Sequence, residues 1–181
     1  TPPGPAPPRV VAVPWVGGGN GDPVLTAVEQ HVVQFLGPES GRAGVSFLGT
    51  ERIDVLRFAA GDVTHYVTLG MSRTPMSGDS ELLTDGPRAE LVLTLRTAQD
   101  SVLRRLATLA ASPAIEGVVI GPGAGLDVGA PLWDGARFTA VPVGAPNLPD
   151  VARVRFPSVP PLAPDGPPPR EISPLGGQRS T

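Results

Sequence analysis

Two histidines and a group of carboxylates are the side chains of this sequence with the most obvious capacity for chemistry. His65 lies in the apolar run VTHYVTLG, and six acidic residues fall between positions 51 and 85. A hydrolase uses such groups as a carboxylate pair or as a histidine that activates a nucleophile. Nothing in the spacing requires two carboxylates to converge, and His65 falls in the middle of a predicted strand. We therefore favour a solvated acidic face and a packed histidine, and keep a small hydrolase as the alternative. The acidic residues are Glu51, Asp54, Asp62, Asp79, Glu81 and Asp85.

Other chemistry is restricted by what the sequence lacks. There is no cysteine, which excludes disulfides, zinc–thiolate sites and cysteine nucleophiles, and His31 is the only other histidine. The glycine-rich run GPGAGLDVG has the glycines of a phosphate-binding loop. The residues after it contain further Gly and Pro, so no helix N-terminus is available to hold a phosphate. We expect no enzyme activity, no cofactor and no metal.

Length and charge narrow the class of protein further. With 181 residues and 18.6 kDa, the chain has room for one ordinary domain. The net charge of −3 and the pI of about 5.3 argue against a nucleic-acid partner. No apolar run approaches the roughly 20 residues of a membrane span, and no signal peptide is recognisable. The expected location is the cytoplasm.

The composition divides the chain into a middle and two ends. Residues 1–21 and 163–181 are rich in Pro and Gly, and we expect a partly disordered arm and tail there. Within the arm only RVVAVPWV has strand character, and Pro14 favours an edge strand or an extended arm. Residues 22–162 are the predicted folded domain.

The middle of the chain predicts an α+β domain with a mixed or antiparallel sheet and two main helices. The first helix begins at Asp22-Pro23 and ends at Gly37-Pro38. The second has Asp100 as its cap and ends at Ser112-Pro113. Between them, ERIDVLRFA and VTHYVTLG predict a hairpin about Gly61, and RAELVLTLR predicts a central strand because both its faces carry apolar residues. Weaker strand candidates are AIEGVVIGPGAG, ARFTAVPV and VARVRFPSV.

Several of these segments together resemble the suppressor-of-fused domain family. The motifs are HYVTLGMS…PM…GD, then RAELVLTL, then SVLRRLATLAASP, with looser matches at RFTAVPV and VRFPSVPPL…E. The resemblance covers most of Val24 to about Glu171. It implies a non-enzymatic domain that clamps an extended peptide of a partner protein by strand addition, through main-chain hydrogen bonds and side-chain pockets. Bacterial relatives of this type look like immunity proteins that neutralise a toxin, which is the role we expect. A regulatory peptide-binding scaffold is a further alternative.

The resemblance also implies where a partner binds. Tyr66 and Asp79 align with positions that contact the bound peptide in the family, although this chain has one extra residue before Asp79. Met71, Ser72 and Met76 lie in the same loop, where an unbranched thioether can adapt to a partner surface. A sheet-face aromatic is the simpler interpretation of Tyr66, and a turn residue that of Asp79. Downstream, GPGAG replaces the Gly-His-Thr turn of the family, so the partner need not resemble the animal one.

Overall fold

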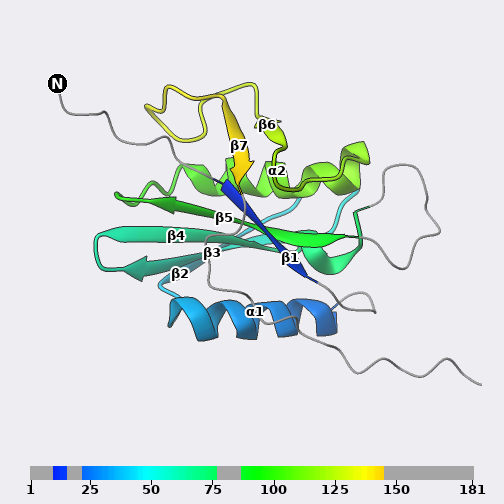
Figure 1. The fold of residues 1–181 in the computed structure, drawn as a ribbon, viewed down its shortest axis with the longest axis horizontal. Helices are drawn as coiled ribbons and strands as arrows, with labels where there is room; N and C mark the ends of the chain where they lie inside the picture. The colour runs from blue at the N-terminus through cyan, green and yellow to red at the C-terminus, as the bar shows by residue number, and fades with distance from the viewer. Residues whose placement is uncertain (1–9, 16–21, 77–86, 145–181) are drawn as a thin grey trace, which may run out of the picture.

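The computed structural model describes residues 10–15, 22–76 and 87–144, and they form an α+β fold with a mixed sheet and two main helices, as predicted (Figure 1). Seven strands make one sheet in the order β2-β3-β4-β5-β1-β7-β6. All neighbouring strands are antiparallel except β1 and β7, which are parallel. The elements are β1 (Val10–Trp15), α1 (Asp22–Leu36), β2 (Gly41–Val45), β3 (Ile53–Ala60), β4 (Val63–Leu69), the 3₁₀ turn η1 (Met71–Arg73), β5 (Arg88–Leu95), α2 (Val102–Glu116), β6 (Gly125–Asp127) and β7 (Ala140–Gly144).

The two helices cover opposite faces of the sheet (Figure 1). Helix α1 packs Val24, Val28 and Val32 on a cluster that includes Phe58 and Val92. The opposite face carries a larger cluster, formed with α2 and with the segments that follow it. Because side chains alternate along a strand, β5 sends Val92 to one cluster and its leucines to the other. The central position predicted for RAELVLTLR is therefore confirmed.

The first helix and the hairpin follow the sequence signals. Helix α1 ends where Gly37, at φ 86°, donates its N–H to the Val33 carbonyl at 2.9 Å. Strands β3 and β4 pair directly up to the Gly61 turn, where φ is 61°, and this pairing confirms the predicted hairpin.

The limits predicted for the second helix were wrong at both ends. Asp100 is not its cap, because α2 begins at Val102 after Ser101 and the Asp100 carboxylate binds other side chains. Pro113 does not end the helix, which continues to Glu116. A proline leaves the carbonyl four residues earlier without its helical donor. Here the Ser112 hydroxyl donates to the Leu109 carbonyl at 2.7 Å, so the helix tolerates the proline.

The strands outside the hairpin were predicted less well. Strand β2 was not predicted, and ARFTAVPV contributes only its end to β7. In AIEGVVIGPGAG the described residues before Gly125 form no strand. The candidate VARVRFPSV lies outside the described residues, as does most of the predicted tail and arm.

Strand β1 lies within the predicted N-terminal arm, but it is a strand of the sheet. It pairs with β5 over six residues and, within the described ranges, with β7 at Val10 and Val11. The edge strand or extended arm expected from Pro14 was wrong, because β1 lies between β5 and β7 in the order of the sheet. Pro14 lies opposite Ala89 of β5, and its missing N–H leaves one main-chain group of the strand without a donor. The sheet thus begins before Asp22, the predicted start of the folded domain.

Candidate functional site

The Gly-Met-Ser turn begins where β4 and β5 stop pairing. Their ladder ends at Val67 and Val92, and side chains replace main-chain groups beyond it. The Thr68 hydroxyl accepts a hydrogen bond from the Leu91 N–H at 2.8 Å and donates to a Glu90 oxygen at 2.6 Å. The gap between the strands is thus filled by a polar network rather than by further sheet.

Glu90 is the centre of this network. One of its oxygens, Oε1, accepts hydrogen bonds from the Gly70 N–H (2.9 Å), the Ser72 N–H (2.9 Å) and the Ser72 hydroxyl (2.6 Å). The side chain is fully buried, and burial raises the pKa of the Glu90 carboxyl, while the hydrogen bonds from Ser72, Thr68 and Gly70 oppose that rise. A buried carboxylate with four donors fixes the course of the chain through the turn. The Ala-Glu-Leu strand and the Gly-Met-Ser turn, which are two of the motifs of the family resemblance, therefore meet at this residue.

A second set of contacts holds the chain after the turn. The buried Arg88 guanidinium donates through Nη1 to the Ser72 carbonyl (2.9 Å) and the Arg73 carbonyl (2.8 Å). Met76 donates its N–H to the Pro87 carbonyl at 2.8 Å, and its sulfur lies 3.4 Å from the Ile120 N–H. Met76 and Pro87, which are eleven residues apart in the sequence, are thus held next to each other.

Tyr66 belongs to a different network. Its ring is buried, its hydroxyl accepts a hydrogen bond from the Gln99 N–H at 2.7 Å, and it donates to the Asp100 carboxylate at 3.2 Å. Arg57 Nη1 binds the same carboxylate at 3.0 and 2.8 Å. This network joins the sheet to the start of α2, and it leaves Asp100 exposed to solvent.

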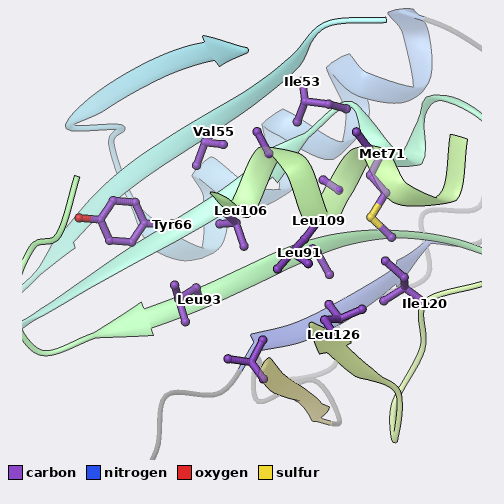
Figure 2. Packing of buried hydrophobic residues seen from close by; sticks show 14 of the residues in the cluster. Ile53, Val55, Tyr66, Met71, Leu91, Leu93, Leu106, Leu109, Ile120 and Leu126 are labelled. Carbon is purple, nitrogen blue, oxygen red and sulfur yellow. The ribbon is translucent and has the colours of Figure 1, made fainter. Parts of the chain in front are cut away.

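The structure separates the predicted partner-binding residues into two groups. Figure 2 shows Tyr66 and Met71 at opposite ends of the larger core cluster. Met71, Ser72 and Met76 share the Glu90 end, and all three are buried, as is Tyr66. Asp79 lies outside the described residues. Direct contact of these five residues with a partner stays a prediction, and the four described ones sit behind the surface rather than on it.

The groups considered for a hydrolase do not form a catalytic arrangement in the described part of the chain. His65 is half-buried, its Nδ1 lies 2.8 Å from the Thr94 hydroxyl, and burial lowers its pKa. Asp54 is held by Arg52 at 2.6 Å and lies 3.7 Å from Arg42. Among the described residues no three His, Cys, Asp or Glu side chains gather as they would around a metal ion. Asp79, Glu81 and Asp85 lie outside the described ranges.

Strand β2 forms one edge of the described sheet. It pairs with β3 from Gly41, opposite Arg57, to Val45, opposite Ile53. Its residues alternate between half-buried and exposed, and the loop that follows carries the fully exposed Leu48. In the described residues its outer main-chain groups face no further strand, which makes β2 a template for an added strand.

Sequence reasoning missed Glu90 as the organising residue. The available signal was a carboxylate in the middle of the apolar strand RAELVLTL, where a charged residue is costly unless it is paired or hydrogen-bonded. The alternation along the strand placed Glu90 on the same face as Val92 and Thr94. It gave no reason to expect a contact between Glu90 and Gly70 or Ser72.

Comparison with protein families agrees with these motifs. A family model described as "Suppressor of fused protein (SUFU)" matches residues 49–162, more than half of the 181-residue chain. No curated protein and no solved structure gives a significant match. No helix among the described residues has the length and apolar character needed to cross a membrane. The matched range contains the Gly-Met-Ser turn, Glu90 and Tyr66, and it is shorter than the span from Val24 to Glu171 suggested by the sequence. The chain belongs to the suppressor of fused family.

Proposed function

We propose that this protein is a non-enzymatic protein-binding domain that holds an extended segment of its partner along strand β2. We further propose that it acts in the bacterial cytoplasm as an immunity protein and that the partner is a toxin. Family membership carries the protein-binding part of this proposal, because suppressor-of-fused-like domains are protein-interaction domains. The open edge of β2 supports the mode of binding, since an added strand gains a full row of main-chain hydrogen bonds.

The strand registers place one end of β2 near the Tyr66 network and the other end near the Gly-Met-Ser turn. Gly41 lies opposite Arg57, which in turn lies opposite Tyr66. At the other end of β2, Val45 lies opposite Ile53, and the Gly70 backbone packs closely on Ile53. A segment of about five residues paired with β2 would therefore run from the Tyr66 network toward the Gly-Met-Ser turn.

The predicted contact residues keep a role in this proposal, mostly an indirect one. Tyr66 holds Asp100 and thereby Arg57 beside the start of β2. Met71, Ser72 and Met76 support the turn behind its far end, and Asp79 follows as a candidate for direct contact. A hydrolase has weaker support, because His65 pairs with a neutral hydroxyl and Asp54 with arginines.

The immunity role is tested by co-expression with the product of the adjacent gene. If that product is a toxin neutralised by this protein, cells that express it alone stop growing, and cells that express both proteins grow and yield a complex. A neighbouring product that is harmless, or one that stays toxic beside this protein, would refute the immunity role.

Amide hydrogen exchange on the purified complex tests the binding mode. Outward-facing N–H groups of Gly41–Val45 should exchange more slowly in the complex than in the free protein, since added-strand hydrogen bonds protect them. Strand β6, the opposite edge of the described sheet, is the internal control and should not change. Protection at β6 instead of β2 would show that the partner binds elsewhere.

A further inference from the structure

The arginines of the described chain fall into two classes. Five of the nine bind carboxylates or main-chain carbonyls; examples are Arg57 on Asp100, Arg52 on Asp54 and Arg88 on the Ser72 carbonyl. The other four are exposed, and within the described ranges none of them forms an ion pair or a side-chain hydrogen bond. These four are Arg96, Arg104, Arg105 and Arg137.

All four lie at the end of the molecule where α2 begins. Arg96 directly follows the last residue of β5, and Arg104 and Arg105 are in the first turn of α2. The loop that carries Arg137 is attached to the same place, because the Asp134 N–H donates to the Ser101 hydroxyl at 2.9 Å. Together they form what we call the arginine surface.

We infer that the arginine surface binds an acidic segment of a protein partner. An exposed guanidinium offers several N–H donors in a planar arrangement that suits a carboxylate. The chain as a whole has a net charge of −3, and these four exposed cations have no ion-pair partner among the described residues. Exposed charges without an internal partner attract and orient a partner of complementary charge.

The chemistry favours separate carboxylates over a continuous polyanion. Asp100 and Asp134 are exposed at the same end, so this end carries negative as well as positive charges. A nucleic acid brings a closely spaced row of phosphates, which these aspartates would repel. A peptide carries its carboxylates on flexible side chains at wider intervals and can reach each arginine while avoiding the aspartates.

The arginine surface also continues the proposed partner path. Gly41 at the start of β2 is opposite Arg57, whose guanidinium binds Asp100 next to the start of α2. A partner segment that leaves β2 at this end meets the arginine surface next. The inference thus rests on the proposed protein-binding function, but its test uses a probe that needs neither strand addition nor a toxin.

The probe is a fluorescent twelve-residue peptide of alternating Glu and Gly, and binding to the full chain is measured by anisotropy over a range of salt concentrations. The R104Q/R105Q variant should bind about tenfold more weakly, as expected for the loss of two exposed charge contacts. The matched control Q30E/Q34E changes the net charge by the same amount on exposed positions of α1, and it should stay within about twofold of the unmodified protein. All four substituted side chains are exposed, so the thermal midpoints should be unchanged, which is checked first.

Equal losses in both variants would mean that only net charge matters and would overturn the inference, as would no binding of the peptide. A single-stranded oligonucleotide of the same length is tested in parallel. If it binds more tightly than the peptide and loses affinity in R104Q/R105Q, the surface is a nucleic-acid site instead. If the peptide does not bind but the complex with the toxin still forms, the arginine surface is not a binding site for an acidic segment. The proposed function is then unaffected.

Discussion

Replacement of Glu90 by Ala should destabilise the domain by about 2–6 kcal/mol. The substitution leaves the Gly70 and Ser72 N–H groups buried without an acceptor, and each such group costs about 1–3 kcal/mol. The hydroxyls of Thr68 and Ser72 can rotate toward other acceptors, so they add nothing to the expected loss of about 2–6 kcal/mol. Since small domains are stable by roughly 5–15 kcal/mol, the loss should be large relative to the total.

Glu90→Gln separates hydrogen bonding from charge. Its amide oxygen can occupy the position of Oε1 and keep three donors, while its NH₂ group faces the Thr68 hydroxyl. Its cost should therefore be clearly smaller than that of Glu90→Ala. The control is Glu116→Ala, which removes an exposed carboxylate at the end of α2 and should change stability by less than about 0.5 kcal/mol.

The measurement is urea unfolding of the three variants and the unmodified protein, followed by circular dichroism, with the free energy taken from the linear dependence on denaturant. If Glu90→Ala is as mild as Glu116→Ala, the carboxylate does not hold the Gly-Met-Ser turn, and our account of how the two family motifs meet is wrong.

Three further predictions use the same unfolding assay. Burial raises the folded-state pKa of Glu90, so the free energy of unfolding should fall as the pH rises toward that pKa and the carboxyl ionises. The stability of the unmodified protein relative to Glu90→Gln should therefore increase as the pH falls. The opposite trend would mean that the hydrogen bonds to the carboxylate outweigh its burial. Tyr66→Phe should cost about 1–2 kcal/mol through its lost hydroxyl contacts, and Tyr66→Ala about 3–5 kcal/mol; an unchanged midpoint in both would contradict the buried position. Gly70→Ala should cost more than Gly61→Ala, since at φ 141° an added Cβ lies 2.9 Å from Ile53 Cδ1, whereas Gly61 has open space; equal costs would refute the close packing.

The sequence was a good guide where local signals and packing agree. Asp22-Pro23 and Gly37 delimit α1, and Gly61 supplies the hairpin turn, because capping and positive φ depend on neighbouring residues alone. The alternation in RAELVLTLR identified the central strand, since both faces had to be buried.

The features that sequence reasoning missed depend on contacts between distant residues. Strand β2 reads GRAGV, with little intrinsic preference for a strand, and it forms because β3 offers it an edge. Pro113 stays inside α2 because a neighbouring serine hydroxyl replaces the missing donor. Tyr66 was grouped with the Met-containing loop through the family resemblance, but strand β4 separates Tyr66 and Met71, which lie at opposite ends of the core cluster (Figure 2).

The place of β1 in the sheet has a consequence for biosynthesis. Val10 pairs with Leu93 and with Val143, so β1, the first strand of the described sheet, needs partners made about 80 and 130 residues later. At roughly 5–20 residues per second, β7 follows β1 by about 7–27 s. For about the first 4–17 s of that interval, before β5 is made, β1 has no neighbouring strand, while the β3–β4 hairpin completes its local contacts. Such long-range pairing slows folding, and the nascent chain carries an unpaired apolar strand that a chaperone or another chain can bind before β5 arrives.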